Sequence, residues 1–385
     1  MIDALLGEPI DDARARARAT FDTLAGGPDR PIVLYGAGGL GRRVARGLAA
    51  LGRRPVALAD RGARPGAAPV EGVPVLPPAE AVERYGRDAV FVVSIWNAQT
   101  DHRYPETEAT LRALGAERVA PALALFWKYP ETFLPYYCLD LPERVLEAAD
   151  DVRRLDAALA DAASRDVLLR QLRWRLALDF DALPLPVDGP AYFQPDLVPL
   201  RADELFVDCG AFDGDSLRPY LERTAGTGAR ALAFEPDPQS FARLSAFLGT
   251  LPSADRERVR ALELAVGARR ERLRFAGSGL LSAGFSEEGD VEVECVPLDE
   301  ILAGEDPTYI KMDLEGAEPE ALAGAALTLR RARPSMAVCV YHRPDHLWSL
   351  PLALRRALPE HSLHLRPHGY EGWDLVCYAV DPERS

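Results

Sequence analysis

The feature that most constrains this chain is the stretch from Glu204 to Ser216, with the sequence Glu-Leu-Phe-Val-Asp-Cys-Gly-Ala-Phe-Asp-Gly-Asp-Ser. Its apolar residues 205–207 predict a short buried strand, and Gly210 and Gly214 interrupt the pattern before a helix begins near Ser216. Open α/β sheets bind ligands where a buried parallel strand leads through such a turn into a helix. The stretch therefore predicts an α/β domain with a ligand site at this turn.

The residues inside the turn narrow the kind of ligand. Asp208, Asp213 and Asp215 surround the glycines, and their carboxylates disfavour phosphate but suit a cationic or polyhydroxyl ligand. Gly210 would let a ligand approach the backbone, which a Cβ would obstruct. Glu235 ends the next predicted strand, near the position expected of an acid that binds ribose hydroxyls. Together these residues predict a nucleoside site.

Composition and charge exclude several classes of protein. A net charge of −14 over 385 residues argues against binding to nucleic acid or to an anionic membrane surface. No apolar run approaches the roughly 18 residues of a membrane-spanning helix. High Ala, Arg, Gly and Pro content is typical of a GC-rich, bacterial type of genome. The cysteines form no CxxC pair and predict buried reduced thiols, consistent with a cytoplasmic location: Cys138, Cys209, Cys295, Cys339 and Cys377.

A second glycine-rich turn lies near the N-terminus, where strand and helix patterns alternate and predict a smaller Rossmann-like domain over residues 1–125. Gly36, Gly38 and Gly41 follow a buried strand, and Asp60 ends the next one. This pattern is a dinucleotide fingerprint, with the helix N-terminus for phosphate and the acid for ribose. Three interpretations stay open: a site for a nucleotide-linked ligand, a retained but unused site, or a domain that mediates assembly.

The rest of the chain divides into two further predicted parts. Residues 126–190 contain an aromatic cluster and a long helical pattern, which predict a connector packed between domains. Residues 191–385 are again α/β. Their order ends in two strands with no helix between them, which predicts an antiparallel hairpin at the C-terminal edge of a mostly parallel sheet. That arrangement is characteristic of class I methyltransferases.

The C-terminal part resembles the FkbM-type methyltransferases over roughly residues 190–381. The resemblance is carried, in the family's order, by residues 207–216, 234–238, 265–267, 296–299 and 309–318. It implies a class I methyltransferase fold that binds S-adenosylmethionine and mostly methylates oxygen. It also implies that Glu235 holds the ribose hydroxyls. The other cofactor-binding positions that we predict are Asp208, Gly210, Ala211, Asp213, Gly214, Asp215, Pro236, Asp237, Ser282 and Asp313.

A second group of acidic residues, Asp313, Glu315 and Glu318, lies at and just after the end of another predicted strand. Asp313 is expected at the carboxyl edge of the sheet, beside the cofactor sulfur. Three roles remain open for it: binding the donor's amino group, ligating a divalent cation together with Glu315, or acting as a base. Glu318 is expected as an acid in the first turn of a helix, and Lys311 as the partner of an acid.

His342 follows another predicted strand and is expected at the same sheet edge, where an imidazole is a competent base. The segment resembles a branch of the family that carries Tyr-His and Asp-x-x-Trp here. Tyr341, Trp348 and Tyr370 would shape the pocket of the methyl acceptor. His346 is expected to cap or pack a helix.

The sequence thus predicts an S-adenosylmethionine-dependent O-methyltransferase with Asp313 or His342 as the base. The resemblance implies that the acceptor is a hydroxyl of a small molecule, such as a nucleotide-linked or glycosylated compound. No nucleic acid or membrane partner is expected, and a homo-oligomer stays open. One alternative is a nucleotide-binding oxidoreductase that uses residues 36–41, although no Tyr-x-x-x-Lys pair follows. The other is a non-catalytic scaffold, which predicts a degenerate cofactor turn.

Overall fold

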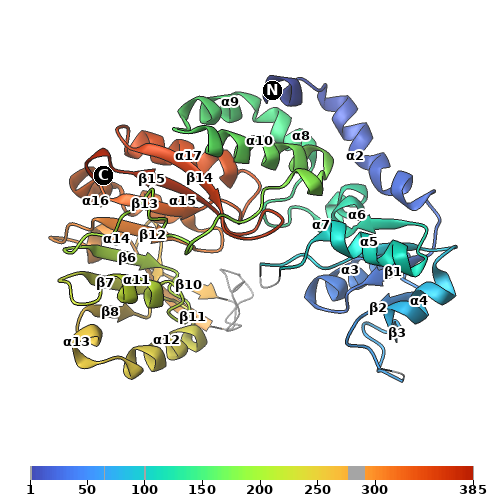
Figure 1. The fold of residues 1–385 in the computed structure, drawn as a ribbon, viewed down its shortest axis with the longest axis horizontal. Helices are drawn as coiled ribbons and strands as arrows, with labels where there is room; N and C mark the ends of the chain where they lie inside the picture. Colours follow the sequence, from blue (N-terminus) through green and yellow to red (C-terminus); the bar gives the residue numbers. More distant parts are fainter. Residues whose placement is uncertain (1, 65, 99–100, 276–290, 385) are drawn as a thin grey trace. The chain divides into compact units, whose positions relative to one another are not determined.

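The computed structural model describes residues 2–64, 66–98, 101–275 and 291–384, which form two compact units (Figure 1). Unit 1 comprises Met1–Arg153, Asp166–Leu185 and Gly369–Trp373. Unit 2 comprises Arg154–Arg165, Pro186–His368 and Asp374–Ser385. Within the described residues, no helix is both long and apolar enough to cross a membrane.

Unit 1 is built on a five-stranded sheet in which every pairing is parallel (Figure 1). The strand order is β3-β2-β1-β4-β5, with bounds β1 Ile32–Tyr35, β2 Ala57–Ala59, β3 Val75–Leu76, β4 Val90–Val93 and β5 Val119–Pro121. The helices before and between the strands are α1 Ile2–Leu6, α2 Ile10–Ala25, α3 Gly39–Ala50, α4 Pro78–Tyr85 and α5 Tyr104–Leu114. This alternation confirms the Rossmann-like sheet that the sequence predicts.

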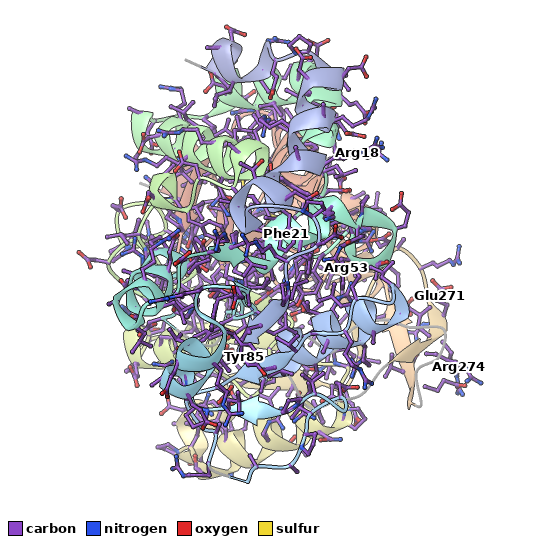
Figure 2. All side chains as sticks on the ribbon, turned by 90° about the vertical axis from the view of Figure 1, so that its right-hand side faces the viewer. Arg18, Phe21, Arg53, Tyr85, Glu271 and Arg274 are labelled. Carbon is purple, nitrogen blue, oxygen red and sulfur yellow. The ribbon has the colours of Figure 1, made fainter. Side chains whose placement is uncertain are left out.

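The amphipathic pattern of α2 explains why this helix packs on unit 1. Ala13, Ala17 and Phe21 recur at four-residue spacing and are almost fully buried, whereas Arg18 is exposed (Figure 2). The helix ends at Gly26, which adopts a left-handed conformation with φ of +73°. The continuous helical pattern expected over residues 1–27 is interrupted between α1 and α2 by Gly7 and Pro9.

The residues of the predicted connector do not form a separate body. They fold into α6 Ala122–Lys128, α7 Pro130–Phe133, α8 Pro142–Glu147, α9 Ala149–Ala158, α10 Ala162–Ala177 and the short helix η1 Phe180–Ala182. Most of them pack in unit 1, and residues 154–165 pack in unit 2. Of the aromatic cluster, Phe126, Trp127 and Phe133 lie in the core of unit 1, where the Phe126 and Phe133 rings stack with centroids 4.8 Å apart.

Unit 2 is built on a seven-stranded sheet with the order β14-β15-β13-β12-β6-β7-β8 (Figure 1). The bounds are β6 Leu205–Cys209, β7 Arg230–Phe234, β8 Val259–Leu262, β12 Tyr309–Met312, β13 Ser335–Cys339, β14 Ser362–Pro367 and β15 Leu375–Val380. Only β15 is antiparallel to its neighbours, β13 and β14. The predicted terminal hairpin is therefore confirmed.

The helices of unit 2 are α11 Leu217–Arg223, α12 Pro238–Thr250, α13 Ser253–Arg256, α14 Leu298–Ile301, α15 Glu318–Ala323, α16 Ala326–Ala332, α17 His346–Ala357 and the short helix η2 Pro382–Arg384. A small second sheet has the order β10-β11-β9, with β9 Ala265–Val266, β10 Glu271–Phe275 and β11 Val291–Val296. Its strand β10 carries charged side chains, of which Glu271 and Arg274 are labelled in Figure 2.

The register of the large sheet brings the predicted site residues to one edge. Strand β12 lies between β6 and β13, and Lys311 pairs with Asp208 across the β12–β6 ladder. Because these strands are parallel, the residues that follow β6, β7, β12 and β13 emerge at the same carboxyl edge. No disulfide joins the cysteines of the described residues, and all five are buried, as predicted.

Candidate active site

The turn after β6 is fixed by a close approach between two strand ends. Gly210 has φ of +89°, and a Cβ there would lie 2.0 Å from the carbonyl oxygen of Asp313. Gly214 has φ of +90°, and a Cβ there would lie 2.6 Å from the ring of Phe247. Both positions therefore require glycine. From the sequence, glycine at position 210 is expected to let a ligand approach the backbone. The structure corrects this reason, because packing against the end of the neighbouring strand already excludes a side chain.

Asp208 lies inside the sheet edge and does not face a ligand. Its side chain is fully buried, its Oδ1 lies 3.0 Å from Nζ of Lys311, and its Oδ2 accepts a 2.5 Å hydrogen bond from Ser216. Lys311 also donates to the carbonyl oxygen of Gly210 at 2.6 Å. This buried ion pair ties β6, β12 and the glycine turn together. It confirms an acid as the partner of Lys311 and corrects the expectation that Asp208 itself lines the ligand site.

Glu235 stands where the sequence places the acid that binds ribose. It follows β7 and is 6% exposed. Its Oε2 accepts a hydrogen bond from the Phe212 backbone N–H, and its Oε1 accepts one from that of Asp237, both at 2.8 Å. Burial raises the pKa of Glu235 to about 7, although these hydrogen bonds oppose the shift. The carboxylate is therefore held rigidly beside the glycine turn, with capacity to accept further hydrogen bonds.

Asp237 has a structural role instead of the predicted contact with the cofactor. Its Oδ2 accepts hydrogen bonds from the backbone N–H and the hydroxyl of Ser240, at 3.0 and 2.8 Å. It is the N-cap of α12, and Pro238 is the first residue of that helix. Because its side chain is only 1% exposed, we correct the expectation that Asp237 lines the ligand site.

The remaining predicted cofactor positions occupy different environments. Asp213 is half-buried and pairs with Arg218 at 3.1 Å. Asp215 is exposed, and its Oδ1 accepts a hydrogen bond from the backbone N–H of Ser216. Ala211 is fully buried, Pro236 is partly buried, and Ser282 lies outside the described residues.

Asp313 is held at the edge by contacts from several segments. Its backbone N–H donates to the carbonyl oxygen of Cys209 at 3.0 Å, and its Oδ2 accepts a 2.9 Å hydrogen bond from the hydroxyl of Tyr192. Burial opposes ionisation, but the neighbouring His342 and Lys311 hold the pKa of the Asp313 carboxyl well below its usual range. The carboxylate is therefore charged, and it remains about one quarter exposed.

Tyr192 is a site residue that the sequence did not reveal. It lies in the proline-rich segment before β6, outside any predicted helix or strand, and its φ is +68°. Its backbone N–H donates to the hydroxyl of Tyr378 at 3.0 Å, and Lys311 Nζ lies 5.0 Å from its ring centroid. No spacing or motif marks Tyr192, because only the tertiary fold carries this segment to Asp313.

His342 is held between two carboxylates. Its side chain is 1% exposed; its Nδ1 lies 2.7 Å from Oε1 of Glu318, and its Nε2 lies 3.2 Å from Oδ1 of Asp313. Burial alone would lower the pKa of His342, but Glu318 and Asp313 raise it well above its usual range. This arrangement disfavours the predicted role as a direct base, because the two carboxylates favour the protonated ring, which has no lone pair to accept a proton.

Further acids surround Asp313 on its accessible side. Burial raises the pKa of Glu315 to about 8, and burial together with repulsion from Asp313 raises that of Asp374 to about 6. Of the predicted acceptor-pocket residues, Tyr341 and Trp348 are each 6% exposed in unit 2. Tyr370, also in that prediction, belongs to the 369–373 segment, which packs in unit 1.

His346 packs beside the same group. Its Nδ1 lies 3.4 Å from Oε2 of Glu318, and its side chain is 1% exposed. Glu318 begins α15, as expected of a helix acid, and its Oε1 accepts a hydrogen bond from the backbone N–H of Leu314 at 2.8 Å. Glu318 thus connects the turn after β12 with both histidines.

The glycine turn of unit 1 has the shape of the predicted fingerprint. Gly36 has φ of +111°, and a Cβ on Gly41 would lie 1.9 Å from the carbonyl oxygen of Gly36. A Cβ on Gly38 would meet no atom within 4 Å. Asp60 accepts hydrogen bonds from the backbone N–H groups of Ala37 and Gly62, at 2.8 and 2.7 Å. Nucleotide binding at this turn stays a prediction.

The side chains at the carboxyl edge of the unit 2 sheet have charges that suit a positively charged adenosyl ligand. Glu235 offers a rigid carboxylate for hydroxyl donors, and Asp215 and Asp313 place accessible negative charge on the other side of the turn. The neighbouring cations are already engaged, Lys311 by Asp208 and His342 by Glu318. The residues present therefore fit S-adenosylmethionine, which carries a positive charge on sulfur.

One family model matches the part of the chain that contains this site. Residues 208–371 match the family model described as the methyltransferase FkbM domain. The matched segment begins at Asp208 and contains Glu235, Asp313 and His342. No curated protein matches the chain.

Among solved structures, the chain is similar to a methyltransferase FkbM from Methylobacillus flagellatus KT. The TM-score is 0.76 at 22% identity, covering 96% of this chain and 99% of that one. This likeness shows that the fold of nearly the whole chain has a solved counterpart. A precorrin-6y C5,15-methyltransferase from Geobacter metallireducens GS-15 is more distant, with a TM-score of 0.30 and 15% identity over 47% of this chain and 80% of that one.

Proposed function

Because residues 208–371 match the family model of the methyltransferase FkbM domain, we propose that this protein transfers the methyl group of S-adenosylmethionine to a hydroxyl of a small molecule. The observation that carries the proposal is the shared sheet edge. The acid that suits the ribose, Glu235, and the acid that suits a reacting hydroxyl, Asp313, follow strands separated only by β6.

Each side chain has a distinct part in cofactor binding. Glu235 accepts hydrogen bonds from the two ribose hydroxyls, and its own bonds to Phe212 and Asp237 fix its orientation. Asp208 and Lys311 hold the glycine turn from inside the sheet. Asp215 supplies negative charge at the accessible end of the turn. None of these groups has to move to receive the ligand.

In this mechanism Asp313 orients the acceptor hydroxyl and receives its proton. Bound S-adenosylmethionine supplies an electrophilic methyl group on a positively charged sulfur. As the oxygen–carbon bond forms and the carbon–sulfur bond breaks, the sulfur keeps the electron pair and the hydroxyl becomes strongly acidic. Even a carboxylate of low pKa then accepts the proton, so positioning matters more than basicity. Tyr192 and His342 keep the Asp313 carboxylate in place.

The acceptor that we propose is a hydroxyl on a sugar or on a glycosylated metabolite. The support is the family resemblance and the concentration of carboxylates at the site, since carboxylates bind polyhydroxyl compounds through charge-assisted hydrogen bonds. Glu315 and Asp374 would contact hydroxyls next to the reacting one. We propose that the enzyme acts in the cytoplasm.

A methylation assay tests the proposal. The full chain is incubated with isotope-labelled S-adenosylmethionine and a panel of nucleotide sugars and glycosylated metabolites, and the site of methylation is determined by mass spectrometry. We expect one methyl group on oxygen, and a loss of at least 100-fold in rate with Asp313→Asn. Absence of transfer to every acceptor, or transfer to nitrogen or carbon alone, would contradict the proposal.

A further inference from the structure

A buried nitrogen at the site lacks a hydrogen-bond partner. Among the residues that the structure describes, none makes a hydrogen bond of acceptable geometry with Nε2 of His342. The nitrogen is nevertheless directed at carboxylates: Oδ1 of Asp313 lies 3.2 Å away and Oε1 of Glu315 lies 3.9 Å away. A buried polar atom without a partner is costly, so something is expected to occupy the space between these atoms.

The spacing of the three atoms suits a metal ion. Cation-to-ligand distances of about 2.0–2.2 Å place two ligand atoms about 2.9 Å apart at a right angle and at most about 4.4 Å apart on opposite sides. The separations of 3.2 and 3.9 Å from Nε2 both lie within this range. Ligand atoms of Asp313, Glu318 and His342 all lie within 4.8 Å of one another, and Glu315 lies near enough to Nε2 to share a cation with it.

The other nitrogen of the ring already has the partner that a metal-binding histidine needs. Nδ1 lies 2.7 Å from Oε1 of the fully buried Glu318, so its N–H donates to that carboxylate. This bond fixes the ring orientation, and once the Nε2 proton of the charged ring is released on cation binding, the Nε2 lone pair faces Asp313 and Glu315. Histidines that bind metal ions commonly have such a carboxylate behind them.

The cation has an open side. The Asp313 and Glu315 side chains remain 25% and 23% exposed, whereas those of His342 and Glu318 are 1% and 0% exposed. A cation on the Nε2 side can thus reach water or an acceptor oxygen. A cation on the Nδ1 side, held by Glu318, would have no such access.

We propose that Asp313, Glu315 and His342 Nε2 bind one divalent cation at the carboxyl edge of β12 and β13, with Glu318 orienting the histidine. Two carboxylates and one imidazole suit an ion that accepts both oxygen and nitrogen ligands, for which Mn²⁺ is a suitable probe. Its role rests on the proposed function: the cation would coordinate the acceptor oxygen and ease removal of its proton.

Titration with Mn²⁺ alone tests the site without an activity measurement. The full chain is treated with a chelator and dialysed, and free Mn²⁺ is followed by electron paramagnetic resonance. We expect saturable binding of one ion per chain. Glu315→Gln and His342→Gln should each weaken binding at least tenfold, and Glu318→Gln by about ten- to 100-fold.

Matched controls separate loss of a ligand from loss of structure. His361→Gln removes another buried histidine, whose Nε2 lies 3.1 Å from the carbonyl oxygen of Pro334, and should bind Mn²⁺ like the wild type. The partly exposed Glu315 keeps the test valid if His342→Gln unfolds. Absence of saturable binding, or unchanged binding by Glu315→Gln, would overturn the proposal. Weakening by Glu318→Gln alone would also overturn it, because the ion would then lie on the buried side.

Binding of S-adenosylhomocysteine to the metal-free protein distinguishes this inference from the proposed function. If S-adenosylhomocysteine binds and Mn²⁺ does not, the cation site is wrong and methyl transfer stands. If Mn²⁺ binds and S-adenosylhomocysteine does not, the cofactor assignment is wrong and the cation site stands.

Discussion

The carboxylates at the edge of the unit 2 sheet differ in charge state because their neighbours differ. Asp208 is matched by Lys311, and Asp313 by Lys311 and His342. Glu235 accepts hydrogen bonds from two backbone N–H groups, and burial outweighs these bonds and the more distant charge of Lys311, which raises its pKa to about 7. The acid assigned to the ribose therefore changes charge near neutral pH, as do Glu315 and Asp374.

This difference predicts a pH dependence of cofactor binding. Above its pKa of about 7, Glu235 is an ionised acceptor for ribose hydroxyls; below it, the protonated form accepts more weakly. The affinity for S-adenosylhomocysteine should fall about tenfold from pH 8 to pH 6 in calorimetric titrations. Glu235→Gln should bind more weakly at pH 8 and lose most of this dependence. An equal slope in the variant would show that another group is responsible.

Tyr192 is predicted to act through Asp313. Tyr192→Phe removes the hydrogen bond to Oδ2 of Asp313, and bonds to charged groups contribute about 1.5–3 kcal/mol. We expect kcat to fall about tenfold or more, with the affinity for S-adenosylhomocysteine changed less than threefold. Tyr220→Phe is the control, because it removes another buried hydroxyl, bonded to the carbonyl oxygen of Arg230. An equal loss of kcat in both variants would indicate a general packing effect.

At the scale of elements, the glycine turn after β6 packs directly against the end of β12. Gly210→Ala would force a Cβ to within 2.0 Å of the Asp313 carbonyl oxygen, in addition to the left-handed strain. Gly226→Ala has the same kind of strain at φ of +73°, but its Cβ would meet no atom within 4 Å. We expect Gly226→Ala to cost about 1–2 kcal/mol, and Gly210→Ala at least about 2 kcal/mol more.

Urea unfolding of the two variants measures this difference. Equal losses in the free energy of unfolding would mean that the turn relaxes without disturbing Asp313. S-adenosylhomocysteine binding should be retained by Gly226→Ala and lost by Gly210→Ala, since only the latter displaces the site.

The site residues could be predicted from the sequence where a single strand and the turn after it determine their position. The β6 turn, Glu235 after β7 and Asp313 after β12 follow from local pattern, because parallel strands bring their carboxyl ends to one edge. The burial of Asp208 and the capping role of Asp237 depend on partners in other segments, so the pattern alone assigned both to the ligand. Tyr192 and the bond between Glu318 and His342 arise only from tertiary packing.

At the scale of the whole molecule, the main sheet of each unit has a glycine turn, and the two turns differ in charge. The turn of unit 2 is rich in carboxylates, whereas that of unit 1 has only Asp60 beside it, bonded to backbone N–H groups. The sequence therefore predicts a phosphate-bearing nucleotide in unit 1 and the methyl donor in unit 2.

Gly38→Ala tests the nucleotide prediction. The added methyl group would meet no protein atom within 4 Å, so the fold should remain intact, but it would fill space that a phosphate needs. Binding of a nucleotide sugar or NADH, followed by calorimetry, should weaken at least tenfold. Gly249→Ala, also in open space, is the control. Absence of binding by the wild type would leave unit 1 without a nucleotide role.

Calorimetric titration of the full chain with S-adenosylmethionine tests the central claim most directly. We predict saturable binding of one molecule per chain, reduced at least tenfold by Glu235→Ala and unchanged by Gly226→Ala. Absence of binding by the wild type, or equal affinity in Glu235→Ala, would contradict the assignment of the β6 turn and Glu235 to the methyl donor.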